Sequence, residues 1–191
     1  PAAAATGELI YELAYANRNR ARQSRSAQDG TRQGFSSCVA ILADRDKLEM
    51  EDEIRTKVPD TLGTRVVCRS GSPLDPDHLQ IVNPETARAI IILSPGGQYP
   101  DMPVAKALLA LRRGRESRSQ PYHIVTAVQR PANIDIMRMI GGDETQVFLV
   151  DRLAAFLIAQ TCRQPGLSVV YDELFSFDYA AMYIDDIPAL V

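Results

Sequence analysis

Three polar segments, each placed directly after an apolar run, carry the residues of this chain that could bind a nucleotide. The apolar run at 38–43 ends at Asp44, whose carboxylate could accept hydrogen bonds from ribose hydroxyls. The segments "CRSGSP" (68–73) and "LSPGG" (93–97) follow two further apolar runs and could offer hydroxyl and backbone N–H groups to a nucleotide. The candidate ligand-binding residues are Asp44, Arg69, Ser70, Gly71 and Ser94.

Each of these residues also has a purely structural interpretation. Asp44 can be a solvated acid near the start of a helix, where a negative charge is favoured. The serines and glycines can serve only to make turns. Asp46 is predicted to be the N-cap of the helix that follows, with Glu49 three residues later as in a capping box. Ligand binding and turn formation both remain open from the sequence.

Acidic residues cluster in two places, and at both a structural role is the stronger interpretation than a metal site. The segment 44–53 lacks the alternating oxygen ligands and the central glycine of an EF-hand loop. Its charges instead have the i, i+4 spacing of ion pairs on an exposed helix face. These pairs are Lys47–Glu51, Glu51–Arg55 and Glu53–Lys57. Near the C-terminus, Asp178, Asp185 and Asp186 are expected in an exposed hairpin.

No pattern typical of a catalytic site is found, so we expect the chain not to be an enzyme. It has no Walker loop and no nucleophile elbow, and His78 and His123 are far apart. Cys38, Cys68 and Cys162 are widely spaced in apolar segments, which indicates reduced thiols inside a cytosolic protein rather than a disulfide framework or a zinc site. Cys162 is expected in the core or at an interface.

The composition is that of an ordinary globular protein. Of the 191 residues, 46% are apolar and 24% are charged. The net charge of -3 gives no attraction to nucleic acid or to an anionic membrane surface. No apolar run is long enough to span a membrane, and the first residues do not resemble a signal peptide.

Predicted helices and strands alternate along the chain, which favours an α/β fold with a doubly wound, mostly parallel Rossmann-like sheet. The strands are continuous apolar runs, as expected for parallel strands buried on both faces. The predicted strands lie at 38–43 and within 64–73, 87–97, 122–128 and 145–150. The predicted helices lie at 7–20, 46–58, 75–83, 102–113, 133–140 and 151–164.

Two segments do not fit a simple alternation. A Rossmann-like sheet needs a central first strand that leads into the first helix, but the chain opens with "PAAAATG". Either that strand precedes Pro1 in a parent protein, or the alanines take its place. The segment from Arg18 to Gln33 is polar and basic, and it is expected to be an exposed, dispensable loop, although its arginines could also contact phosphate.

The predicted helix at 151–164 is apolar on more than one face, and such a wide stripe indicates an interface. We expect self-association through this helix and the segment "LSVVYDELF" that follows it. The candidate interface residues are Leu153, Phe156, Leu157, Ile158, Tyr171 and Phe175.

The segments 39–54, 64–93, 139–177 and 182–190 resemble the cytosolic part of Castor/Pollux-type ion channels, which carry RCK domains (regulators of conductance of potassium). The most specific motifs are "CRSGSP" and "QPGLSVVYDELF" (164–175). The resemblance implies a Rossmann-like lobe at 1–150 and, at 151–191, a crossover helix with the beginning of a smaller lobe. The first strand and its glycine turn are absent, and "FDYAAMY" (177–183) stands where a glycine and an acidic turn are expected.

By this resemblance the chain is expected to be a non-catalytic gating-ring domain of a cation or potassium channel, at the cytoplasmic face of a membrane. Its partners would be a second copy of itself, in a homodimer that builds a tetrameric or octameric ring, and a transmembrane pore domain of the same parent protein. Relatives differ in ligand, so NAD, an adenine nucleotide and calcium are all open. The alternatives are a stand-alone nucleotide-binding subunit of a potassium transporter and a nucleotide-dependent enzyme domain.

Overall fold

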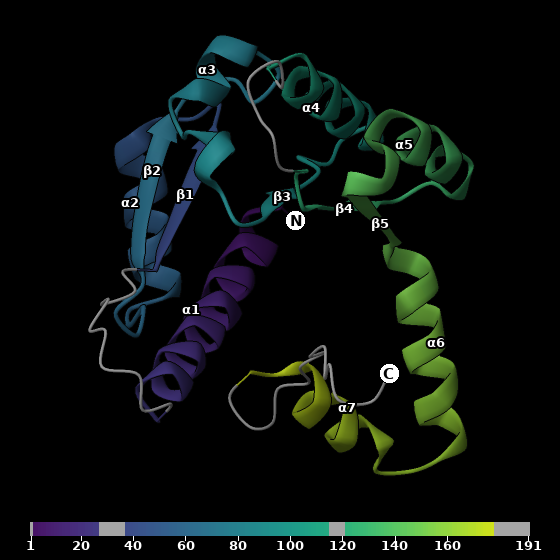
Figure 1. Ribbon diagram of the computed structural model, residues 1–191. Coiled ribbons are helices and arrows are strands. Elements are labelled where there is room, and N and C mark those ends of the chain that lie inside the picture. Colours follow the sequence, from purple (N-terminus) through teal and green to yellow (C-terminus); the bar gives the residue numbers. More distant parts are fainter. Residues whose placement is uncertain (1, 27–36, 115–120, 178–191) are drawn as a thin grey trace, which may run out of the picture.

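The computed structural model describes residues 2–26, 37–114 and 121–177 and has an α/β fold in which helices alternate with strands (Figure 1). The strands are β1 (Cys38–Ala43), β2 (Arg65–Ser70), β3 (Ile90–Ile92), β4 (Ile124–Val128) and β5 (Thr145–Leu149). The α-helices are α1 (Ala2–Ser26), α2 (Lys47–Lys57), α3 (Pro76–Gln80), α4 (Asp101–Arg113), α5 (Ile134–Gly141), α6 (Val150–Arg163) and α7 (Leu167–Phe175). The 3-10 helices within the described residues are η1 (Pro84–Thr86), η3 (Pro131–Asn133) and η4 (Gly142–Glu144), each of a single turn.

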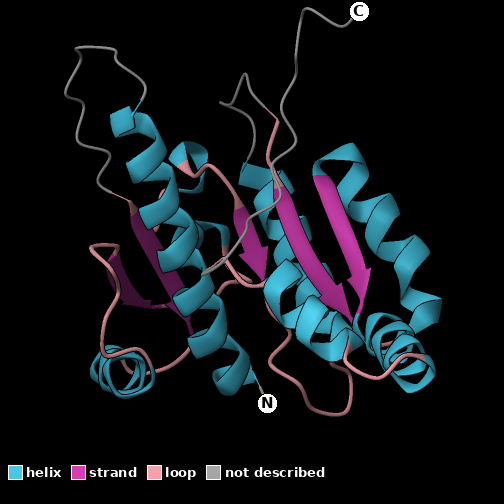
Figure 2. Cartoon of the chain, turned by 90° about the horizontal axis from the view of Figure 1, so that it is seen from below, coloured by secondary structure: helices cyan, strands magenta, loops and turns pink. Residues whose placement is uncertain are grey.

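All strand pairs among the described residues are parallel, which confirms the predicted α/β class, but these strands form two sheets instead of one. Strands β1 and β2 form the first sheet, in the register Cys38↔Arg65 to Ala43↔Ser70. Strands β3, β4 and β5 form the second sheet in that order. Figure 2 shows the two sheets on opposite sides of the molecule, with α1 between them in this view. Strand β3 has only three residues and is shorter than the apolar run predicted.

Helix α2 begins and ends close to the predicted positions because its caps are encoded locally. The carboxylate of Asp46 accepts hydrogen bonds from the N–H groups of Leu48 at 2.8 Å and Glu49 at 3.2 Å, which confirms it as the N-cap. Among the predicted ion pairs, Lys47–Glu51 and Glu53–Lys57 are present. In the third, the structure pairs Arg55 with Asp52 instead of Glu51.

Helix α1 is longer than predicted at both ends. The alanines after Pro1 are helical, so the interpretation that they replace a strand is wrong; alanine has the highest helix propensity of all residues. The prediction of a loop beginning at Arg18 is also wrong as far as Ser26, because arginine, glutamine and alanine continue the helix at little cost. The remainder of that predicted loop, 27–36, lies outside the described residues.

The main core forms where α3, α4 and α5 pack around β4. Val104 and Leu108 of α4 are fully buried, and Ile124 and Val128 of β4 and Met137 of α5 are buried with them. Leu42 of β1 packs against this cluster. Burying one such side chain stabilises the fold by about 1.5–3 kcal/mol. This core positions the loops that follow β3 and β4.

The C-terminal helices form an arm that extends away from the sheets (Figure 1). Helix α6 directly follows β5 and ends before Pro165 and Gly166, as predicted. Helix α7 turns back toward α1. Just after α7, the backbone N–H and carbonyl groups of Phe177 both form hydrogen bonds with side chains of α1. Its N–H donates to the Glu12 carboxylate at 2.9 Å, and its carbonyl accepts from the Asn19 amide at 2.6 Å. Among the described residues, no helix combines the length and apolar character needed to cross a membrane.

Replacing Asp101 by alanine should destabilise the protein by about 2–4 kcal/mol, because three donors would lose their acceptor in a buried place. The Asp101 carboxylate is 2% exposed and accepts from Gln129 N–H (2.8 Å), Arg130 N–H (3.0 Å) and the Asn133 amide (2.7 Å). Burial alone would raise the pKa of Asp101, but these hydrogen bonds outweigh it and lower the pKa.

The stability that Asp101 contributes should therefore be present above its unfolded-state pKa, about 3.9, and be lost as the pH falls through the lower folded-state pKa. Urea unfolding from pH 7 down to pH 3 measures this contribution. The control is Asp135→Ala, which removes an exposed carboxylate from the first turn of α5. Equal effects of the two changes at pH 7 would contradict the role of Asp101.

Gly141→Ala should destabilise the protein by about 1–3 kcal/mol, because a Cβ atom there would overlap the side chain of Thr145. Thr145 is buried and its hydroxyl donates to the Gly141 carbonyl at 3.3 Å, so it has little freedom to move. The matched control is Gly114→Ala, where the added Cβ meets only Gln80, at 3.6 Å. Thermal unfolding of both variants is the measurement, and a Gly141 variant as stable as the control would contradict the prediction.

Candidate functional site

The carboxyl ends of β1 and β2 bring several predicted ligand-binding residues together. Ala43 of β1 is the register partner of Ser70 of β2. Asp44 and Gly71, the next residue of each strand, therefore lie at the same edge of the sheet. The side chains of Asp44 and Ser70 are both exposed at this edge. A carboxylate and a hydroxyl group at neighbouring strand ends can accept from, and donate to, the hydroxyl groups of a ligand.

The turn after β2 has a fixed shape. The Gly71 N–H donates to the Ala43 carbonyl at 3.0 Å, so this N–H is already used. A Cβ atom on Gly71 would lie 3.0 Å from the Leu42 side chain and 3.4 Å from His78, which explains a glycine here. The Ser72 N–H donates to His78 Nδ1 at 3.1 Å and holds the turn against α3. Gly71 therefore shapes this edge, and Asp44 and Ser70 provide its exposed polar groups.

Arg69 lies one residue before Ser70 and is half-buried. Its Nη1 donates to the carbonyl of Cys68 at 3.0 Å, which folds the guanidinium back along its own strand. The other N–H groups of the guanidinium could still contact an anion, since arginine has five donors in all.

Ser94 follows β3 and therefore lies at the end of the other sheet. Its hydroxyl donates to the Pro100 carbonyl at 2.6 Å and accepts from the Gly96 N–H at 3.2 Å. Gly96 and Gly97 have φ of +86° and +93°, values that favour glycine. The hydroxyl of Ser94 thus closes its own loop.

Asp101 and Arg130 join this loop to the one that follows β4, and neither was predicted from the sequence. The Arg130 guanidinium donates to the Gln98 carbonyl at 2.9 Å and lies 5.7 Å from the centre of the Tyr99 ring. Asp101 lies three residues after Gln98, at the start of α4. Its carboxylate accepts hydrogen bonds from the backbone N–H groups of Gln129 and Arg130 in the loop after β4. The sequence does show an acidic residue, Asp101, at the start of an apolar helix. It does not show which residues donate hydrogen bonds to that carboxylate, because they lie almost thirty positions later in the chain.

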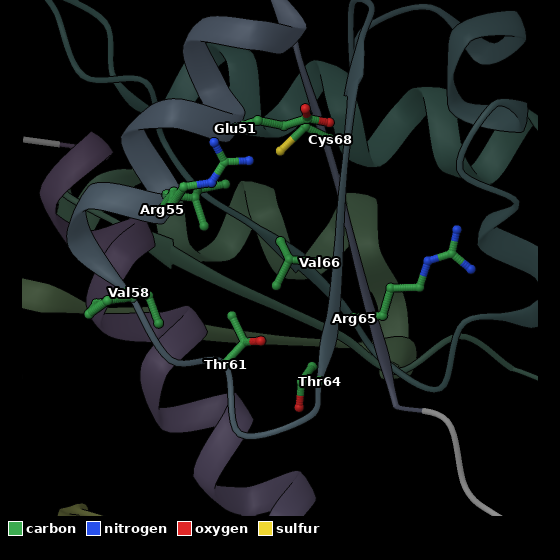
Figure 3. Close-up of a pocket in the computed structure, with 10 residues that line it drawn as sticks. Glu51, Arg55, Val58, Thr61, Thr64, Arg65, Val66 and Cys68 are labelled. Carbon is green, nitrogen blue, oxygen red and sulfur yellow. The ribbon is translucent and has the colours of Figure 1, made fainter.

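A cavity of about 500 Å³ lies between α2 and β2, away from the carboxyl edge where sequence reasoning placed a ligand (Figure 3). It extends to Thr61 and Thr64, which precede β2, so it opens toward the amino end of that strand. Burial raises the pKa of the Cys68 thiol, and the nearby Glu51 carboxylate adds to this effect. The thiol therefore stays protonated at neutral pH and is a poor nucleophile, so Cys68 gives this cavity no reactive thiol.

The candidate interface residues all lie on the α6–α7 arm. Leu153, Phe156, Ile158 and Phe175 are exposed, between 49% and 64%, whereas Leu157 and Tyr171 are half-buried. The rings of Tyr171 and Phe175 stack at 6.1 Å.

The cysteines are less buried than expected. Cys68 is buried, but Cys38 and Cys162 are exposed, so neither of these two lies in the core. The acids Asp178, Asp185 and Asp186 lie outside the described residues. Within the part of the chain that the structure describes, no three His, Cys, Asp or Glu side chains form a group that could hold a metal ion.

Comparison with known proteins relates nearly the whole chain to one group of channel proteins. No family model matches the chain. Over 96% of its length it is 33% identical to the probable ion channel POLLUX of Arabidopsis thaliana and 32% identical to the ion channel CASTOR of Lotus japonicus. It is 30% identical, again over 96% of its length, to the ion channel DMI1 of Medicago truncatula. The chain spans 21%, 20% and 19% of the lengths of these three relatives. The resemblance seen in the sequence is therefore confirmed: the chain is homologous to a segment, about a fifth in length, of the Castor and Pollux ion channels.

Proposed function

We propose that this chain is a non-catalytic regulatory domain of a cation channel, at the cytoplasmic face of a membrane. The observation that carries the proposal is its similarity, over 96% of its length, to a segment of proteins named as ion channels. In the proposed arrangement the pore belongs to another part of the same parent protein. Ligand binding at the carboxyl edge of the sheets then changes how several copies of the domain assemble, and so changes the pore.

The carboxyl edge of β1 and β2 supports the ligand-binding part of the proposal. The Asp44 carboxylate makes no hydrogen bond with another described residue, and Ser70 is exposed beside it. Both groups can therefore bind a ligand without breaking a contact of the fold. The proposed ligand is NAD or an adenine nucleotide, since a carboxylate at a strand end is suited to ribose hydroxyls. Arg69 would contact the same ligand, while Gly71 and Ser94 would shape the two turns that face it.

The arm supports the assembly part. Exposed apolar side chains gather on α6 and α7, and a contiguous apolar surface of this kind marks a protein interface. A second copy of the domain is the proposed partner, and the dimer would build a tetrameric or octameric ring. In such a ring, a movement at one interface reaches every subunit.

Asp44→Ala should weaken nucleotide binding roughly tenfold or more, because a hydrogen bond to a charged acceptor contributes about 1.5–3 kcal/mol. The free energy of unfolding should change by only a few tenths of a kcal/mol, since the carboxylate is solvated without a ligand. Titration calorimetry with NAD, ATP and ADP measures the affinity. The control is Asp52→Ala, which removes a carboxylate that is 77% exposed on α2. Equal affinity of the wild type, Asp44→Ala and Asp52→Ala would exclude Asp44 from the site.

Phe156→Asp should weaken self-association roughly 30-fold or more, because a central apolar side chain of an interface typically contributes about 2 kcal/mol. Phe156 is 55% exposed, so the change should leave the fold intact. Sedimentation equilibrium at tens of micromolar measures the dimer. The control is Leu48→Asp, which charges an apolar residue that is 68% exposed on α2. A wild-type chain that is strictly monomeric would contradict the proposed interface.

A further inference from the structure

The turn after β2 is held by a hydrogen bond whose acceptor is an imidazole ring. The Ser72 N–H donates to Nδ1 of His78, on the short helix α3, at 3.1 Å. A neutral imidazole has a single acceptor nitrogen, so the ring proton of His78 must be on Nε2. An imidazolium has a proton on both nitrogens and accepts a hydrogen bond at neither. The contact between Ser72 and His78 therefore exists only while the ring is uncharged.

The carboxylate of Asp75 provides an alternative partner for the same nitrogen. Its Oδ2 lies 3.8 Å from His78 Nδ1, which is too far for a hydrogen bond. Its Oδ1 accepts from the Asp77 N–H at 3.0 Å and caps α3. Once Nδ1 carries a proton, it can donate to Oδ2 after a small rotation of the side chain. The cap of α3 is kept, and Asp75 balances the charge that the ring has gained.

The imidazole is accessible to protons from solvent, because the His78 side chain is 47% exposed. On the side of the turn, the ring packs against Gly71, where an added Cβ would lie 3.4 Å from His78. Residues 70–74 of this turn carry no charge. Among the described residues, no carboxylate other than Asp75 comes within 4 Å of a ring nitrogen.

Other charged groups surround α3 at longer range. They are Asp44 after β1, Arg69 on β2, Asp77 on α3 itself, and Asp101, Lys106, Arg112 and Arg113 on α4, which packs against α3. Three of them are bound to other partners: Arg69 to the Cys68 carbonyl, Asp101 to the loop after β4, and Arg112 to the Ile140 carbonyl. Asp75 is thus the group placed to respond when the ring becomes charged.

The turn after β2 has two ties to α3, and the imidazole provides one of them. The other is local, since the Asp75 N–H donates to the Ser72 carbonyl at 3.2 Å. On the strand side, the Gly71 N–H stays bound to β1 and fixes the end of β2. Losing the imidazole contact would therefore leave the strands intact and loosen only the turn, directly beside the exposed Ser70 of the candidate edge.

We propose that His78 is a pH-sensitive switch: the neutral ring fixes the turn after β2, and a proton taken from solvent by Nδ1 releases Ser72 and pairs the ring with Asp75. The released turn no longer holds Ser70 in one position, so ligand binding at the carboxyl edge weakens as the pH falls. Between about pH 5 and pH 8, histidine is the side chain that ordinarily changes charge. The effect on the ligand rests on the proposed function, whereas the release of the turn does not.

The Ser72 amide reports the release of the turn directly. In amide NMR spectra recorded from about pH 8 to about pH 5.5, its signal should shift together with the ring signals of His78. Its exchange with solvent, after correction for the intrinsic dependence on pH, should become at least about fivefold faster. A Ser72 amide that does not follow the ring signals of His78 would overturn the proposal.

Two substitutions of His78 fix the switch in one state each. In His78→Asn, Oδ1 takes the place of Nδ1 as an acceptor that does not titrate, so the Ser72 amide should stay protected throughout. In His78→Ala, the same amide should be released at every pH. The control is His123→Asn, which removes the other histidine of the chain and should leave the transition unchanged. A transition that persists in His78→Asn would overturn the proposal.

Asp75→Asn tests the exchange of partners. The asparagine Oδ1 can still cap α3, but the charged ring loses its ionic partner. The transition of the Ser72 amide should therefore move to lower pH. An unchanged transition would overturn the role assigned to Asp75.

Titration calorimetry with NAD measures the consequence for binding, because NAD itself does not change charge between the two pH values. Its affinity should be about three- to tenfold lower at about pH 5.5 than at about pH 8, both in the wild type and in His123→Asn. In His78→Asn the affinity should be equal at the two pH values. Higher affinity at the lower pH would show that the imidazolium attracts the phosphates of the ligand, and it would overturn the proposal.

The failure of the switch can be distinguished from the failure of the proposed function. If NAD binds the wild type equally well at both pH values, the ligand site stands and the switch is wrong. If none of NAD, ATP and ADP binds at about pH 8, the proposed ligand site is wrong, and the effect on binding is wrong with it. The Ser72 amide then still decides whether the turn is released.

Discussion

Helix α4 is held at both ends by polar groups, and the arrangement of β3, β4 and α5 depends on this. At its first turn, the buried Asp101 carboxylate binds the loop after β4. At its last turn, Arg112 donates to the carbonyl of Ile140 at the end of α5. Between them, Val104 and Leu108 have no exposed surface. A buried carboxylate is tolerable only because all its contacts come from donors, so the loop after β4 has to keep one conformation.

The fixed position of α4 also fixes the conformation of the loop between β3 and α4, which contains the candidate residue Ser94. The hydroxyl of Ser94 binds the carbonyl of Pro100, one residue before Asp101, and Arg130 binds the carbonyl of Gln98. The loop at the carboxyl end of β3 is thus rigidly connected to α4. The polar groups after β1 are different, since Asp44 is exposed and bound to no described residue. A carboxylate that is bound to no described residue can bind a ligand without reorganising the fold.

Helix α1 lies between the two regions that the proposed function needs, the sheets with their ligand-binding edge and the α6–α7 arm. Its first residues lie near β3, and its middle binds the backbone of Phe177 through Glu12 and Asn19. The arm therefore rests on α1 at one end, through α7, and on β5 at the other, where α6 begins. A shift of α1 at the candidate site would move the contact that orients the arm. We regard α1 as the physical link between ligand binding and assembly in the proposed function.

Local patterns in the sequence determined the elements of the fold and much of the candidate edge. The strand at 38–43, the Asp46 cap and the end of α6 before Pro165 follow from residue types within a few positions, so they were predicted correctly. The same local evidence placed Asp44 and Ser70 at strand ends, and parallel pairing made them neighbours. It failed for Arg18–Ser26, where polar composition resembled a loop although helix propensity was high. Only the tertiary structure decided which donors surround Asp101 and where the backbone of Phe177 binds, because each of these contacts joins residues far apart in the chain.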